Sequence, residues 1–239
     1  MTIHDSELGT ITLRPNPRAR KIICRYRDGR FLLTHPPYTS KKEIEHVIES
    51  MRQSMLKLRE RTTGTQTELK NGSVLNLCST KITISEGRLS NFYCTPKDGA
   101  YHLICPEKTD YNSPSTKAIL KKHIENILRK EAHKLLPPKV EKYASLYHFS
   151  YQEVKINKSR SRWGSCSSKK NINLSYFCLF LPEYLINFVI LHELCHTKEM
   201  NHGPEFWKLL DSVTKNKSQE LTKELSLQSR TTARLRCLD

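Results

Sequence analysis

Two histidines four residues apart, His192 and His196, form the pattern H-E-x-x-H at the end of an apolar run. On a helix this spacing puts both imidazoles on one face, where a single tetrahedral zinc ion can take a nitrogen from each. Glu193 follows the first histidine and is rotated away from the ligand line. It can therefore act as a general base without binding the metal. This stretch predicts a hydrolytic metal site.

His202 is the candidate for the third ligand that a catalytic zinc site needs. Asn201 and Gly203-Pro204 favour a helix that ends before His202, so that the chain can fold back toward the metal. The preceding run, residues 184–191, is almost entirely apolar and is typical of a buried helix. Histidines at the end of a buried helix need partners, which favours a metal site over a chance match to the motif.

The elements around the motif can be placed from breakers and periodicity. Pro182 beside an acid predicts the start of the metal helix, and Gly203-Pro204 opens another helix that packs against it. Residues 151–156 and 171–176 are predicted strands, because polar and apolar residues alternate in the second of them. Upstream, a helix is expected over 116–136, ended by Pro137-Pro138 and followed by a shorter helix over 140–147.

The first part of the chain is predicted to be rich in β-strands. Asp28-Gly29 and Asp98-Gly99 are hairpin signals, and a helix capped by Ser40 lies between the two groups of strands. Residues 110–114 are typical of a linker. We therefore expect an α+β protein with a β-rich N-terminal part carrying one helix over residues 1–110 and a catalytic domain over 111–239. No internal repeat is evident.

Composition narrows the classes of partner. The 239 residues include 40 basic and 24 acidic ones, which gives a net charge of +16. This charge suits an anionic partner or proximity to nucleic acid, and it suits about equally a merely basic surface that aids solubility. No apolar run reaches the ~20 residues of a membrane span, and residues 1–7 lack a signal pattern. The prediction is a cytoplasmic protein with no membrane segment. None of the eight cysteines forms a C-x-x-C pair, which argues against a cysteine zinc ribbon.

Four stretches together resemble the YgjP-like metallopeptidase group, which are compact zincins related to the SprT-like and Wss-like proteases. They are S-R-W-G-S-C-S at 161–167, I-N-L at 172–174, H-E-L-C-H at 192–196 and N-H-G-P-E-F-W at 201–207. The N-terminal strands, with their arginine-rich link, also resemble the front half of that group. The resemblance implies Zn²⁺ bound by His192, His196 and His202, with Glu193 as general base.

The resemblance also implies a minimal zincin-like domain, in which a small sheet packs on the H-E-x-x-H helix. The edge strand of such a sheet holds a peptide by β-addition, and residues 172–176 are our candidate for the strand beside the cleft. The metzincin pattern has the same histidine spacing, but Glu199 stands where that pattern has glycine. Metzincin membership is therefore not assigned.

A second cluster lies just before the metal helix, where residues 154–182 hold six basic residues and no acidic one. An ordinary solvated loop would explain it. Alternatively, Arg160, Arg162 and Lys169 form an anion-binding rim beside the metal cleft. Such a rim suits a protein substrate held on nucleic acid or a nucleoside triphosphate, although the chain has no glycine-rich phosphate loop.

Three functions remain open from the sequence. The leading one is a zinc-dependent metallopeptidase acting on a polypeptide. One alternative is a metal-dependent nucleoside-triphosphate pyrophosphohydrolase, for example on UTP, an activity described for some members of the resembling group. The other is a non-catalytic zinc-binding or nucleic-acid-binding module. Glu193 separates the enzymes from the module, because a structural zinc site is closed and has no use for a positioned base.

Overall fold

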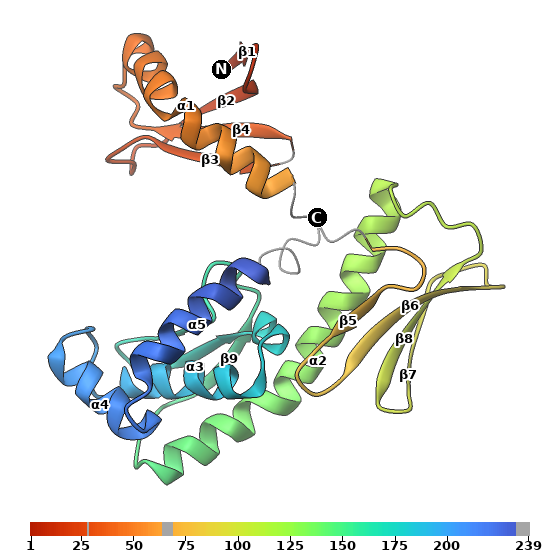
Figure 1. Cartoon of the computed structure of the whole chain (residues 1–239), viewed down its shortest axis with the longest axis vertical. Coiled ribbons are helices and arrows are strands. Elements are labelled where there is room, and N and C mark those ends of the chain that lie inside the picture. The colour runs from red at the N-terminus through yellow and green to blue at the C-terminus, as the bar shows by residue number, and fades with distance from the viewer. Residues whose placement is uncertain (28, 64–68, 233–239) are drawn as a thin grey trace. The chain divides into compact units, whose positions relative to one another are not determined.

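The computed structural model describes residues 1–27, 29–63 and 69–232, and its contacts divide the chain into two compact units, Met1–Gln66 and Thr67–Asp239 (Figure 1). The fold is α+β, with strands and small sheets at the front of the chain and helices toward its end, as predicted. The division by contacts lies elsewhere than the predicted boundary between residues 110 and 111. That position falls inside the second unit, because the strands before it and the helix after it share one hydrophobic core.

The first unit is a four-stranded sheet with one long helix. Its strands are β1 (Thr2–Asp5), β2 (Gly9–Pro15), β3 (Ile23–Arg27) and β4 (Arg30–His35), in the order β1-β2-β4-β3, and the helix is α1 (Lys41–Thr63). Ser40 and Glu43 form a reciprocal capping box at the start of α1, with N–H to oxygen distances of 2.7 and 3.2 Å. Alternate strand residues such as Leu13 and Phe31 are buried with Ile48 of α1, which lies against one face of the sheet.

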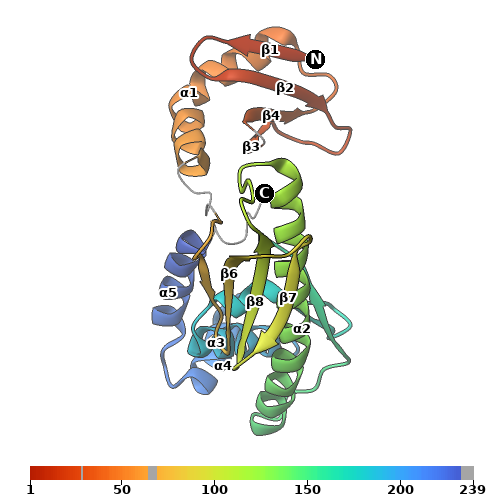
Figure 2. The same ribbon diagram turned by 90° about the vertical axis from the view of Figure 1, so that its right-hand side faces the viewer.

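The second unit begins with another four-stranded sheet, which packs on a very long helix. Its strands are β5 (Val74–Asn76), β6 (Lys81–Gly87), β7 (Tyr93–Lys97) and β8 (Ala100–Pro106), and the helix is α2 (Pro114–Leu146). Figure 2 shows β6, β8 and β7 side by side, with α2 next to them. Ile84 and Leu103 of the sheet and Leu120 and Ile124 of the helix belong to one buried cluster. Inside that cluster, Tyr101 donates a hydrogen bond of 2.7 Å to Glu131.

The prediction that Pro137-Pro138 ends this helix is wrong, since α2 continues through both prolines to Leu146. Each proline lacks a backbone N–H and crowds the preceding turn, which costs about 3 kcal/mol in an isolated helix. Leu136, Val140 and Ala144 are all buried on both sides of the prolines. Burial of this continuous apolar stripe offsets the local cost, so packing overrides propensity here.

A three-stranded sheet follows, made of β9 (Val154–Asn157), β10 (Gly164–Cys166) and β11 (Ile172–Ser175) in the order β10-β11-β9. The strand predicted over 171–176 therefore exists, but it is the central strand and not an edge strand. Both sides of β11 are paired, to β10 in antiparallel and to β9 in parallel fashion. The edge that could accept another strand next to the metal helix belongs to β10, whose three residues gave no strand signal in the sequence.

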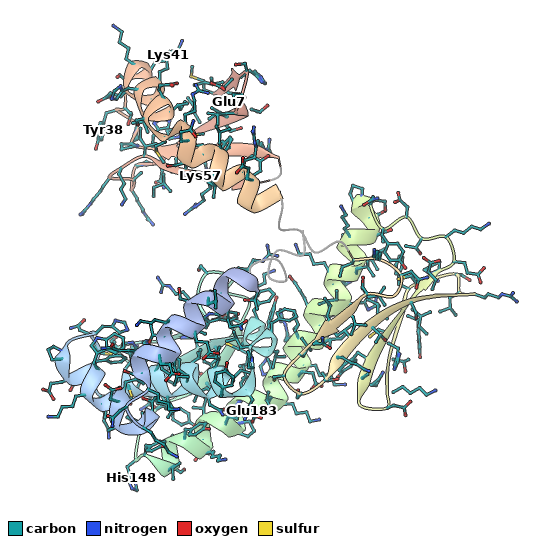
Figure 3. All side chains as sticks on the ribbon, viewed as in Figure 1. Glu7, Tyr38, Lys41, Lys57, His148 and Glu183 are labelled. Carbon is teal, nitrogen blue, oxygen red and sulfur yellow. The ribbon has the colours of Figure 1, made fainter. Side chains whose placement is uncertain are left out.

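The chain then forms a short 3₁₀ segment, η1 (Tyr176–Phe180), and three helices, α3 (Glu183–Cys195), α4 (Pro204–Thr214) and α5 (Ser218–Thr231). Pro182 precedes α3 as predicted, and Glu183, which Figure 3 labels, lies in the first turn of the helix. Its carboxylate pairs with Lys139 of α2. Leu185, Ile190 and Leu194 of α3 are fully buried, while α2, α4, α5 and β10 contact the helix. Within the described ranges, no helix is both long and apolar enough to cross a bilayer.

The two four-stranded sheets repeat one another. Both have an antiparallel, a parallel and an antiparallel pairing in the same order, and each is followed by a long helix. The registers also agree: Ile11 pairs with Phe31 and Leu13 with Leu33 in the first sheet, as Ile82 pairs with Tyr101 and Ile84 with Leu103 in the second. The prediction of no internal repeat is therefore wrong. Equivalent residues lie about 70 positions apart. The two sheets share the alternation of buried and exposed residues, but most equivalent positions hold different amino acids.

Candidate metal centre

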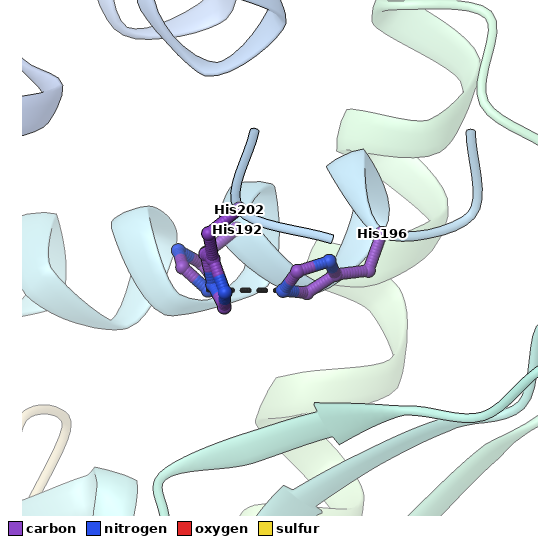
Figure 4. A group of neighbouring side chains, drawn as sticks. All are labelled: His192, His196 and His202. Atoms are coloured by element: carbon purple, nitrogen blue, oxygen red, sulfur yellow. Dashed lines mark hydrogen bonds between the residues drawn. The ribbon is translucent and has the colours of Figure 1, made fainter. Parts of the chain in front are cut away.

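The three histidines of the motif region converge on one point (Figure 4). His192 and His196 lie one turn apart at the end of α3, and His202 returns from the segment between α3 and α4. Nε2 of His192 is 3.2 Å from Nε2 of His196 and 3.0 Å from Nε2 of His202. One ligand atom from each residue lies within 4.8 Å of the other two. The predicted fold-back after α3 thus places the third imidazole next to the first two.

The geometry fits a zinc ion. Two imidazole nitrogens bound at about 2.05 Å in a tetrahedral arrangement lie ~3.3 Å apart, close to the two Nε2 separations. Nδ1 of His196 is 2.9 Å from the backbone carbonyl of Glu199, so its N–H donates there and the lone pair of Nε2 faces the other rings. Burial and the two neighbouring imidazoles lower the pKa of His192 to about 3. His192 is therefore neutral at pH 7, as a metal ligand must be, and burial also lowers the pKa of His196.

Phe206 of α4 supports all three imidazoles. Its ring is fully buried, stacks on His196 at 4.5 Å between centroids, and meets His192 and His202 edge-on at 5.0 and 4.7 Å. Pro204 occupies the first turn of α4 and begins that helix two residues after His202. The same short connection therefore delivers one imidazole and the ring that holds the set in place.

Glu193 follows His192 on α3, so its side chain leaves the helix in a different direction from the two histidines. The side chain is buried. Its burial raises the pKa of the carboxyl group to about 8, against the opposing effects of the Arg162 guanidinium and the backbone N–H of Cys166. Among the described residues, no group donates a hydrogen bond to its Oε2. A buried carboxylate oxygen without a partner is costly, which indicates that a polar atom from outside the chain, such as water or substrate, meets Oε2.

Gly164 of β10 approaches the Glu193 side chain very closely. A Cβ atom at position 164 would lie 2.7 Å from both Cγ and Oε1 of Glu193 and 2.9 Å from its Cδ. Real Cβ atoms essentially never lie within 3.0 Å of a non-bonded heavy atom, so one of the two groups would have to move. Only glycine lets the edge strand run against the carboxylate, so β10 and α3 fix the position of the carboxylate together.

The change Gly164→Ala is therefore expected to displace the Glu193 carboxylate. A displacement of about 1 Å at a reacting group can lower the rate by roughly 100-fold, so the rate of a reaction in which Glu193 takes part should fall by about that factor. Metal content should stay at the wild-type level, because the three atoms nearest to an added Cβ all belong to Glu193 and none to the imidazoles. Steady-state kinetics with metal analysis of the same samples measure both.

The matched control is Gly203→Ala, where an added Cβ meets nothing within 4 Å. The activity of this variant should stay within a few-fold of the wild type. Position 203 is the N-cap of α4, where glycine and alanine differ mainly in their preference for capping a helix. Equal losses in the two variants would contradict a specific role for the contact between Gly164 and Glu193.

The three predicted rim residues are not brought together. Arg162 lies close enough to lower the pKa of Glu193, and it lines a pocket of about 320 Å³ with Ser165 and Asn173. Arg160 instead lies 3.9 Å from Glu125 of α2. Lys169 is exposed in the turn between β10 and β11. Because Ser165 and Asn173 alternate with residues that face the core, the pocket opens on the sheet face away from α3.

Two residues of the site were missed in the sequence. Phe206 and Gly164 were quoted only as parts of the 201–207 and 161–167 runs. A single sequence holds no signal for either role, because both depend on contacts between segments far apart in the chain.

Trp163 packs in the core, and its Nε1–H donates a 2.8 Å hydrogen bond to Ser229 of α5.

Comparisons with known proteins find one matching family model and two matching solved structures. A family model described as the YgjP-like metallopeptidase domain matches residues 20–227. Among solved structures, the metallopeptidase zymogen abylysin of Pyrococcus abyssi is 20% identical with a TM-score of 0.36, over 39% of this chain and 94% of that one. The metallopeptidase zymogen jannalysin of Methanocaldococcus jannaschii is 23% identical with a TM-score of 0.35, over 39% and 95%. No curated protein matches the chain. Because the family model spans most of its length, the chain belongs to the YgjP-like metallopeptidase family.

Proposed function

We propose that this protein is a zinc-dependent peptidase, with His192, His196 and His202 as the metal ligands and Glu193 as the general base. The observation that carries the proposal is the convergence of three Nε2 atoms beside a buried carboxylate with an unpartnered oxygen. A structural zinc site usually has four protein ligands, whereas three ligands leave a position open for chemistry. Within the described residues no fourth histidine, cysteine or carboxylate joins the group.

A zinc ion held by the three imidazoles would supply Lewis acidity toward the substrate carbonyl. Glu193 accepts a proton from the attacking water and passes it to the leaving amine nitrogen. For this role its carboxyl must begin ionised, and a nearby dication lowers a pKa that burial has raised. The contact with Gly164 holds the carboxylate in place, so the proton is exchanged at a fixed atom.

The edge of β10 is the proposed site for the substrate backbone. Ser175 donates its N–H to the carbonyl of Trp163 at 2.8 Å, and Ser167 donates to Asn171 at 3.0 Å, so these backbone groups point inward to β11. By the alternation of an antiparallel ladder, the backbone groups of Gly164 and the carbonyl of Cys166 point to the outer edge, while the Cys166 N–H faces the Glu193 carboxyl group. An extended peptide added there would run along the strand that touches Glu193. This moves the predicted peptide-binding strand from 172–176 to 164–166.

Nucleotide hydrolysis is less well supported by the surroundings of the site. The phosphates of a nucleoside triphosphate need several cations that converge. Of the three predicted rim residues, only Arg162 acts on Glu193, while Arg160 pairs with Glu125. A peptide substrate requires no such cluster, so peptide hydrolysis is the function that the arrangement supports best.

The test is hydrolysis by the zinc-loaded protein of denatured casein and of a panel of nucleoside triphosphates that includes UTP. We expect new peptide ends in the casein reaction and no release of pyrophosphate above the rate in a metal-free sample. Pyrophosphate release that depends on zinc, without peptide cleavage, would overturn the proposal. Zinc binding without either product would do so in favour of a binding module.

A further inference from the structure

Another concavity lies in the first unit, remote in the sequence from the three histidines. The described residues that line it are strongly basic. It has a volume of about 870 Å³ and is formed by the link between β2 and β3 together with β3 and β4. Its five cationic side chains, here named the basic face, are Arg14, Arg18, Arg20, Lys21 and Arg25. All five are exposed, and no acidic residue is among the described residues that line the concavity.

The strand alternation explains how the basic face arises. Ile11, Leu13 and Leu33 point to α1 and are buried, so their neighbours along the strands point to the opposite, open face of the sheet. Arg14 of β2 pairs with Thr34, and Arg25 of β3 pairs with Leu32. The link between β2 and β3 adds the other three cations along the border of the same face.

The internal repeat shows that the fold itself does not require these charges. By the shared registers, Arg14 corresponds to Ser85 and Arg25 to Thr95 in the second four-stranded sheet. Both equivalent positions are neutral, although the two sheets have the same topology and each packs on a long helix. The arginines of the first sheet are therefore dispensable for building a sheet of this kind, which favours a binding role for them.

The charges of the basic face are also not balanced within the described chain. None of the five cations takes part in an ion pair with a described acidic residue, whereas Arg52 on α1 is paired with Asp5 at 2.9 Å. Like charges gathered in one concavity repel one another and create a positive potential that attracts anions. The net charge of +16 adds to this attraction at long range.

We propose that the basic face binds the phosphate backbone of a double-stranded nucleic acid. A phosphodiester backbone offers one negative charge per nucleotide at regular intervals, and four of the five cations are arginines, whose planar forks suit phosphate oxygens. No aromatic side chain is among the described lining residues, so unpaired bases would have no stacking platform. This favours a duplex over a single strand. The proposal does not depend on the peptidase proposal.

The test measures binding of the full chain to a fluorescein-labelled 20-base-pair DNA duplex by fluorescence anisotropy, at several salt concentrations. The double variant Arg14→Ser with Arg25→Thr installs the residues of the second sheet, which keeps the strands compatible with their fold. We expect at least a tenfold weaker Kd at 100 mM salt. The slope of log Kd against log salt should fall by about 2, because two phosphate contacts are lost.

The matched control removes two exposed lysines of α2, Lys117→Ser with Lys134→Thr, and so lowers the net charge by the same amount. It should bind the duplex within about twofold of the wild type. Equal weakening in both variants would show that net charge and not the basic face is responsible, and would overturn the proposal. So would the absence of duplex binding, or tighter binding of polyglutamate or of a single strand than of the duplex. Circular dichroism confirms that both variants are folded.

Discussion

Glu193→Gln is expected to lower kcat for peptide hydrolysis by about 1,000-fold, within the range that general base catalysis contributes. Glutamine has almost the same shape as glutamate but cannot accept the proton of the attacking water. The zinc content should stay at the wild-type level, because the three converging Nε2 atoms belong to other residues. Zinc analysis and casein cleavage on one preparation separate the loss of the base from the loss of the metal.

Stability gives a second readout for the same variant. Burial raises the pKa of Glu193 to about 8, so an ionised carboxylate is costly in the folded protein without metal, and a neutral amide removes that cost. The Tm of the metal-free variant should therefore equal or exceed that of the metal-free wild type. A lower activity caused by misfolding would instead come with a lower Tm.

Glu199→Gln is the matched control for Glu193→Gln. Glu199 is exposed, and only its backbone carbonyl takes part in the site, as the acceptor for His196. Its side-chain change should leave kcat within about twofold of the wild type. If Glu193→Gln keeps more than a tenth of the wild-type activity, another group removes the proton and the assignment of the base is wrong.

The local parts of the site could be predicted because they depend on short spacings. The i and i+4 positions of His192 and His196 lie on one helix face whatever surrounds the helix. The breakers at Asn201 and Gly203-Pro204 end that helix in time for His202 to return, and the structure places its Nε2 3.0 Å from that of His192. That these residues bind a metal stays a proposal, but their convergence could be predicted from residues close together in the sequence.

Features that depend on distant contacts could not be predicted. Two prolines inside α2 break the local rule, and only the buried stripe around Leu136 and Val140 shows why the helix continues. The order of strands in the small sheet decides that β10 is an edge, and its residues Gly164–Cys166 carry no alternation of their own. The internal repeat was missed because it is carried by burial alternation and register, which become visible only when the strands are paired.

His202→Ala is expected to remove the metal while the fold persists. His202 is the exposed member of the three, and it lies outside any helix, so truncation opens no cavity in the core. Loss of one of three ligands should weaken zinc binding by at least about 100-fold, since even changes behind the ligands cost 10-fold to 100-fold. After dialysis against a weak chelator, the wild type should retain one zinc per chain, and the variant should retain much less.

Thermal unfolding tests the same assignment without any activity measurement. A ligand that binds only the folded state adds ~4 kcal/mol when its free concentration is 1,000 times its Kd. The wild-type Tm should therefore fall when EDTA strips the zinc, whereas the Tm of His202→Ala should hardly respond. His133→Ala removes an exposed histidine of α2 and should respond to EDTA like the wild type. If His202→Ala still gains stability from stoichiometric zinc, the third ligand is another residue. The proposed site of three histidines with one open position would then be wrong.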